Sequence, residues 1–188
     1  MQKITGMTTI TAVVLMLMVA LNVHAASKEE QQQKIVAMAQ QSLQQLYEKE
    51  PSAKAAIQNA AGYAVFSDMG VKILLAGSGN GQGVAVSKTG QRTFMKMVEL
   101  QAGLGFGVKK FRNIFVFESE NAMNSFVNSG WQFGGQATAA AKSSTSGGAM
   151  AGATSVGDGI WMYQLTDKGL EASITGTGAK YYKNDSLN

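Results

Sequence analysis

The spacing of apolar residues changes once along the chain, and this change constrains the fold more than any other feature. Before Gly62 the spacing is helical: helices are expected over residues 27–48, with Ser27 as N-cap, and over residues 52–61, with Ser52 as N-cap. The apolar residues on one face of the first helix are Ile35, Ala39, Leu43, Leu46 and Tyr47. After Gly62 apolar and polar residues mostly alternate, which is the period of a β-strand.

The alternating region is expected to form an antiparallel sheet. Strands are expected over 62–68 and 71–77, and a hairpin turns at Thr89-Gly90, with its second strand continuing to Val108. Residues 113–119 are apolar on both faces, which favours a central strand. A helix capped by Ser119 follows, further short strands come next, and residues 179–188 form a tail. The expected fold is α+β, with N-terminal helices on an antiparallel, glycine-rich, barrel-like or strongly curved sheet with one inserted helix.

Two glycine series keep a strict period of two, within GSGNGQG (77–83) and GLGFG (103–107). Nucleotide-binding loops need G-x-G-x-x-G opening a helix, or G-x-x-x-x-G-K-[ST], and neither pattern occurs, so no nucleotide is expected. We instead expect a strip without side chains, against which residues 137–141 or the N-terminal helices pack closely. The glycines given this structural role are Gly77, Gly79, Gly83, Gly103, Gly105 and Gly107.

The first 25 residues have the pattern of a secretory signal. Lys3 precedes an apolar run over 12–21, and Val23 and Ala25 fit the small-residue cleavage rule. Cleavage near Ala25 would make the protein periplasmic or secreted, and a retained N-terminal anchor is the alternative. The expected organisation is a signal peptide (1–25), a helical segment (26–61) and a β-rich domain (62–188), the last two forming one structural unit.

The chain has no cysteine, and its single histidine, His24, lies in the expected signal peptide. This composition excludes histidine-dependent triads, cysteine nucleophiles and Cys/His metal sites, so we expect a non-enzymatic protein without a cofactor or metal. A carboxylate pair remains the enzymatic alternative, with Glu99, Glu118 and Glu120 as candidates. Removing Lys3 leaves 15 basic and 12 acidic residues, a net charge of +3, which does not favour a nucleic-acid partner.

Basic residues cluster twice, in KKFR (109–112) and in KYYK (180–183). Cationic and aromatic side chains together suit anionic lipid headgroups, although ordinary charged strand ends are an equal alternative. The predicted lipid contacts are Lys109, Lys110, Arg112, Lys180, Tyr181, Tyr182 and Lys183.

From about residue 55 to 182 the order of several motifs resembles the SYLF domain family. The matching segments are AAGYAVFSDMGVK, the Gly/Gln strand around Gln101, NIFVFESENAMNSF, GWQFGG and GLEASITGTGAKYY. This family binds lipid and includes eukaryotic endocytic, actin-associated proteins, so the resemblance implies its fold and contact with anionic membrane lipid. A protein-interaction or structural module of the bacterial envelope is the alternative, with the glutamine-rich helix and residues 143–157 as contact surfaces.

Overall fold

The computed structural model describes the backbone of residues 5–73, 76–102, 107–134, 150–167, 169–171 and 178–188. Side chains are described for the same residues except 5–26, 68–73, 76–77, 100–102, 107–109, 133–134 and 171. The helices of this part of the chain are α1 (Thr5–Lys49), α2 (Ser52–Asn59) and α3 (Glu120–Asn128). Its strands are β1 (Gly62–Ile73), β2 (Ala76–Ser87), β3 (Arg92–Ala102), β4 (Gly107–Phe117), β5 (Trp131–Gly134), β6 (Thr154–Gly157), β7 (Ile160–Thr166), β8 (Gly169–Glu171) and β9 (Gly178–Lys183).

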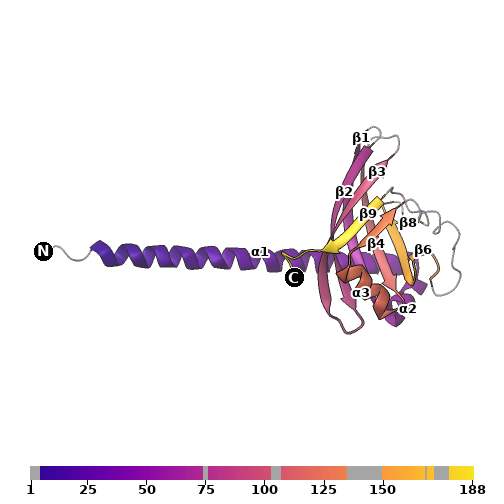
Figure 1. Cartoon of the computed structure of the whole chain (residues 1–188), viewed down its shortest axis with the longest axis horizontal. Coiled ribbons are helices and arrows are strands. Elements are labelled where there is room, and N and C mark those ends of the chain that lie inside the picture. The colour runs from indigo at the N-terminus through magenta and orange to yellow at the C-terminus, as the bar shows by residue number, and fades with distance from the viewer. Residues whose placement is uncertain (1–4, 74–75, 103–106, 135–149, 168, 172–177) are drawn as a thin grey trace.

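One of the three expected helix caps is confirmed and two are wrong. Helix α1 is continuous through Ser27, and its first half projects away from the sheet (Figure 1). At the start of α2 the backbone of Pro51 is already helical, and the Ser52 hydroxyl donates to Glu50 Oε1 at 2.6 Å instead of capping. Ser119 does cap α3: its backbone is extended and its Oγ accepts from the backbone N–H of Ala122 at 3.2 Å.

The strands form one antiparallel sheet in the order β5-β9-β3-β2-β1-β4-β7-β6, with β8 paired to β7. The central position predicted for residues 113–119 is confirmed, because β4 lies between β1 and β7. The expected C-terminal tail is corrected, since β9 inserts between β3 and β5.

Two expected strand boundaries in the first hairpins are also corrected. Strand β1 does not break at Met69, because this residue pairs with Asn80 on one side and Lys110 on the other. The hairpin at Thr89-Gly90 is confirmed, with Gly90 at φ +85° and its N–H donating to the Ser87 carbonyl at 2.8 Å. The strand expected to run on to residue 108 is instead divided between β3 and β4, which have different neighbours in the sheet.

The sheet is strongly curved, which confirms the expected fold class. In the sheet order, β9 and β4 are separated by four strand intervals, or about 19 Å if the sheet were flat. Yet the rings of Phe115 in β4 and Tyr181 in β9 have centroids 5.0 Å apart. The face that carries both rings is therefore concave.

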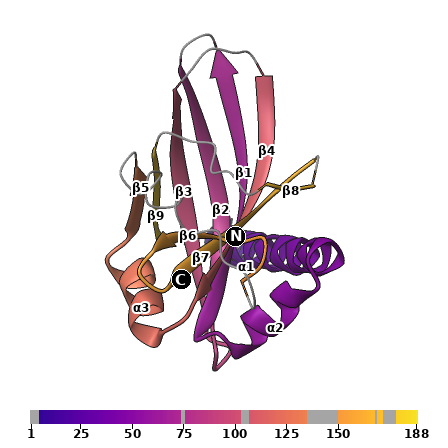
Figure 2. The same cartoon turned by 90° about the vertical axis from the view of Figure 1, so that its right-hand side faces the viewer.

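Each face of the sheet has its own core, and Figure 2 shows α1 and α2 on one side and α3 on the other. The concave core joins α3 to the aromatic interior, and its largest members are Phe66, Phe115, Phe117, Phe126 and Tyr181. The convex core joins α1 and α2 to the opposite face, through residues that include Ile35, Leu46, Val65, Ile114 and Tyr163. Both faces of the central strands are thus buried.

At Gly83, the member of the expected glycine series whose surroundings are described, the space is filled by the neighbouring strand β1 and not by a helix. A Cβ on Gly83 would overlap the Phe66 ring and the Val65 carbonyl, and one on Gly81 would lie 2.6 Å from Met97 Cγ. A helix does approach a glycine closely at Gly62, where a Cβ would overlap Sδ of Met123 in α3. Gly77, Gly79 and Gly107 lie in strands β2 and β4, whereas Gly103, Gly105 and residues 137–141 lie outside the described residues.

Candidate functional site

A row of polar side chains crosses the convex face of the sheet. In this row each residue is the cross-strand partner of the next. The row consists of Tyr182 in β9, Lys96 in β3, Gln82 in β2, Ser67 in β1 and Arg112 in β4. Cross-strand partners point to the same face. The row therefore extends over four strand intervals, or about 19 Å.

Helix α1 runs beside this row, since it crosses the strands at a steep angle (Figure 1). Lys34 lines the same hollow as Lys96 near one end of the row, and Arg112 Nη1 donates to Gln45 Oε1 at the other. The helix rises about 17 Å between residues 34 and 45, which is close to the length of the row. Helix and row form the two walls of a channel on the convex face, which we call the α1 trough.

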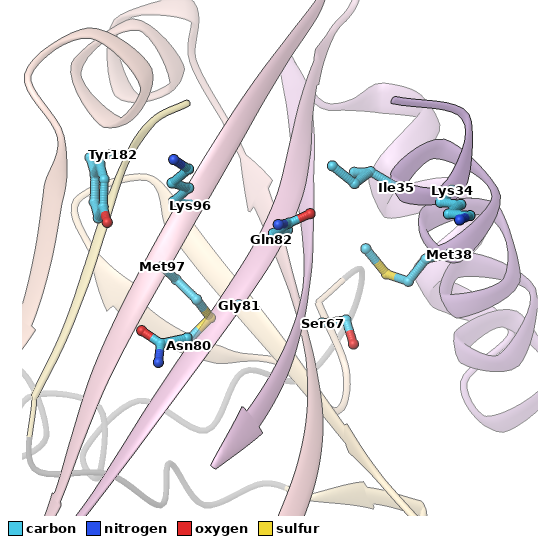
Figure 3. A pocket seen from close by; sticks show the side chains of 10 residues that line it. All are labelled: Lys34, Ile35, Met38, Ser67, Asn80, Gly81, Gln82, Lys96, Met97 and Tyr182. Carbon is cyan, nitrogen blue, oxygen red and sulfur yellow. The ribbon is translucent and has the colours of Figure 1, made fainter. Parts of the chain in front are cut away.

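The first hollow of the α1 trough has a volume of about 430 Å³. Figure 3 shows Ile35 and Met38 projecting from α1 toward the strands that carry Gln82 and Lys96. Its lining is Lys34, Ile35, Met38, Ser67, Asn80, Gly81, Gln82, Lys96, Met97 and Tyr182. The lining thus combines two lysines and several hydrogen-bonding side chains with an apolar wall, and none of its described residues is acidic.

The two lysines of the first hollow differ in their partners. Lys34 is exposed and forms an ion pair with Glu30 one helical turn earlier, with Nζ and Oε1 2.6 Å apart. This ion pair lowers the pKa of the Glu30 carboxyl, through its hydrogen bond to Lys34 and then through the lysine charge. Lys96 is half-buried and makes no ion pair or side-chain hydrogen bond with any described residue. Lys96 is therefore the cation best placed to receive an anion.

A second hollow of about 450 Å³ continues the trough beyond Ser67, which lines both hollows. Its lining is Gln45, Glu48, Lys49, Ser67, Lys110, Phe111, Arg112, Leu165, Thr166, Asp167 and Gly169. The two hollows together carry the cations Lys34, Lys49, Lys96, Lys110 and Arg112 and the acids Glu48 and Asp167. The trough is therefore positively charged, most uniformly in its first hollow.

The trough brings together members of both basic clusters. Lys110 and Arg112 line the second hollow and Tyr182 lines the first. Lys180 is exposed on the same face, in the neighbouring cross-strand row that also contains Lys110. The curved sheet therefore joins two segments about 70 residues apart in sequence along one surface.

The remaining predicted contacts lie elsewhere. Tyr181 is 2% exposed within the concave core, so its predicted surface role is wrong. The reason is strand alternation, which turns Tyr181 inward and its neighbours outward. Lys183 is exposed, but its Nζ donates to Asn128 Oδ1 of α3 at 2.8 Å, away from the trough. The side chain of Lys109 lies outside the described residues.

Lys34 and Lys96 were not singled out from the sequence, although they line the first hollow. Each is an isolated lysine: Lys34 lies in the glutamine-rich helix, and Lys96 lies between Met95 and Met97. A weak signal exists, since Lys96 interrupts the apolar face of β3 between Phe94 and Val98. Only the packing of α1 on the sheet brings the two together.

Glu99 lies far from the other two candidate carboxylates, Glu118 and Glu120. The strand pairing sets Glu99 of β3 level with Lys109 at the start of β4. Glu118 comes directly after Phe117, which is eight residues further along β4 than Lys109. Eight strand residues span about 27 Å, well beyond the separation of about 5–9.5 Å between paired glycosidase carboxylates. Glu118 and Glu120 are both exposed where β4 leads into α3, and Glu118 Oε1 accepts from Trp161 Nε1 at 2.9 Å.

Two general features of the described residues bear on the site. No three His, Cys, Asp or Glu side chains gather there in an arrangement that would hold a metal ion. In the same part of the chain, no helix has the length and apolar character needed to cross a membrane.

A protein of known name is similar to this chain in sequence. No protein-family model matches the chain. The chain is 32% identical over 157 residues to beta cell expansion factor A of Aeromonas veronii, and the match covers 80% of this chain and 56% of the relative. The chain thus spans only about half the length of a protein to which it is clearly similar in sequence.

Proposed function

We propose that this protein is a non-enzymatic, exported envelope protein that binds anionic lipid. The α1 trough carries the proposal, because five cations line it against two acidic residues. Export is proposed from the signal-like pattern of residues 1–25, and lipid as the ligand from the resemblance to the SYLF family.

Two cations of the convex face, one in the trough and one beside it, lie where a membrane surface can reach them. Lys110 and Lys180 are exposed on the convex face and lie about 19 Å apart across four strand intervals. Each lysine or arginine near an anionic membrane surface contributes about 1 kcal/mol to binding. Several such residues on one face together support reversible binding, which salt weakens by screening.

Co-sedimentation of the full chain with vesicles tests the proposal. We expect binding to vesicles that contain phosphatidylglycerol, and little binding to pure phosphatidylcholine. The double variant K96Q/K110Q should bind the anionic vesicles about thirtyfold more weakly, which corresponds to about 2 kcal/mol. The apolar residues near the N-terminus are present in every variant and therefore do not affect this comparison.

The matched control is K54Q/K88Q, which removes two exposed lysines from α2 and from the β2–β3 turn. This variant has the same net charge as K96Q/K110Q, so a general charge effect would weaken both equally. Equal binding of the two double variants, or equal binding of both vesicle types, would refute the proposed lipid contact.

A protein-interaction module is the second candidate, and two observations favour it. The exposed face of α1 carries Gln33, Gln40, Gln41 and Gln44. The printed name of the relative, beta cell expansion factor A, describes an effect on beta cells and no lipid. A stoichiometric protein partner that stays bound in detergent, with no binding to anionic vesicles, would favour this candidate.

A further inference from the structure

We propose that the first hollow of the α1 trough binds one anionic amphiphile as a monomer, with its head group at Lys96 and its chain along α1. The inference rests on the proposed lipid function and deepens it, since it names the ligand class and its position.

The strand wall of the hollow suits an anionic head. Lys96 is half-buried and unpaired among the described residues, and an anion would offset the cost of its partial desolvation. Gln82 and Asn80 from β2 and Tyr182 from β9 add neutral hydrogen-bond donors beside it. Because the lining residues that the structure describes include no acid, none of them repels an anion.

The helix wall suits an apolar chain. Ile35 and Met38 project from α1 into the hollow, as Figure 3 shows. Methionine is unbranched and adapts its shape to irregular ligands. The hollow, at about 430 Å³, is within the range of about 300–1,000 Å³ usual for small-molecule sites.

The shape of the trough favours a single molecule over the surface of a bilayer. Met38 is half-buried inside the hollow and does not stand on the outer surface, so one chain lying along the helix contacts it more readily than a flat membrane surface does. The trough continues past Ser67 to Leu165 in the second hollow. From Lys96 to Arg112 the row spans three strand intervals, or about 14 Å. This is close to half the hydrocarbon thickness of a bilayer, about 15 Å, so an extended acyl chain of that length fits along it.

Calorimetric titration of the full chain with laurate, below its micelle concentration, tests the inference. Two probes separate head from tail: acetate has the same carboxylate without the chain, and dodecyl maltoside has a twelve-carbon chain with a neutral head. We expect laurate to bind at least tenfold more tightly than either probe.

Three variants locate the site. K96Q should weaken laurate binding about tenfold, as expected for the loss of a charged hydrogen-bond partner. N80W places a large ring in the hollow from an exposed position and should prevent laurate binding. K88Q, in the β2–β3 turn, should bind laurate like the unchanged chain. Thermal melting shows whether each variant is folded.

The outcomes separate this inference from the lipid-contact proposal. If acetate binds as tightly as laurate, the acyl chain contributes nothing and the inference is wrong about the chain. If dodecyl maltoside binds as tightly as laurate, the charged head contributes nothing and the inference is wrong about Lys96. Laurate binding that K96Q and N80W leave unchanged would place the ligand elsewhere. If the protein binds anionic vesicles but not laurate, the inference fails while the proposed function stands. If it binds laurate but not anionic vesicles, only the proposed contact with a membrane surface is refuted.

Discussion

The rings of Phe115 and Tyr181 have centroids 5.0 Å apart, although their strands, β4 and β9, are separated by four strand intervals in the sheet. The Asn113 amide in β4 also reaches the Tyr181 hydroxyl, with Nδ2 and Oη 3.4 Å apart. These contacts connect two distant strands of the sheet, β4 and β9, across its concave face. Helix α1 packs on the opposite, convex face and forms one wall of the trough there.

Removal of the Tyr181 ring should therefore weaken the whole fold. We expect Y181A to lower the free energy of unfolding by about 3–5 kcal/mol, because it leaves a cavity among the rings of Phe66, Phe115 and Phe126. Y181F keeps the ring and loses the hydrogen bonding of the hydroxyl, including the long bond from Asn113, so it should cost about 1 kcal/mol and much less than Y181A. Urea denaturation measures both. If Y181A is as stable as the unchanged chain but no longer binds vesicles, Tyr181 acts at the surface as the sequence predicted.

Addition of a side chain at Gly83 should also be destabilising. In G83A the new Cβ overlaps the Phe66 ring and the Val65 carbonyl, and overpacking of this kind costs about 1–3 kcal/mol. The control is G157A, whose Cβ would lie 3.5 Å from Ile160 Cδ1, an ordinary contact. Similar melting temperatures for the two variants would contradict the account given for the glycine series.

Tyr163 presents the opposite case, a buried hydroxyl that lacks a hydrogen-bond partner among the described residues. Y163F removes the unsatisfied group and keeps the ring, so we expect stability at pH 7 to be unchanged or to rise by about 1 kcal/mol. Denaturant unfolding of the variant measures this effect. A loss of more than 1 kcal/mol would mean that the hydroxyl contributes a stabilising interaction.

The same tyrosine predicts a decline of stability in alkali. Burial, and then the nearby charge of Glu50, raises the pKa of Tyr163 to about 12, against about 10 in an unfolded chain. The folded state holds this proton more tightly than the unfolded chain does. The stabilisation linked to this proton is therefore fully present below pH 10, and the free energy of unfolding falls as the pH rises from about 10 through about 12. Unfolding measured from pH 9 to 12 should therefore show a shallower decline in Y163F than in the unchanged chain. Parallel curves would contradict the assigned pKa.

The cap of α3 gives a local test. S119A removes the oxygen that accepts from the Ala122 N–H and should cost about 1 kcal/mol, whereas S119D keeps an acceptor and should cost little. Thermal melting of both variants measures the difference. S52A is the comparison in α2, where the serine loses a hydrogen bond to Glu50 but no cap. The effect at Ser119 is not capping if S119D is as destabilising as S119A.

The sequence alone determined the features that depend on neighbouring residues. The periodicity of the chain predicted the helix at 119–128 with its cap, the hairpin at Thr89-Gly90, the central strand and the α+β class, and the structure confirms each of them. These features follow from backbone geometry and from the alternation of side chains over a few residues. The same local rules wrongly made Ser52 a cap, because the preceding Pro51 had already entered the helix.

Only the tertiary structure decided which residues share a surface. Strand β9 pairs with β3 although their paired residues lie 78 to 88 positions apart in the sequence, and this pairing turns Tyr181 into the core and sets Tyr182 opposite Lys96. Alternation defines two faces of a strand, but it specifies neither which face becomes concave nor which helix covers it. The α1 trough, with Lys34 and Lys96 on facing walls, exists because the aromatic interior curves the sheet and α1 crosses its outer face.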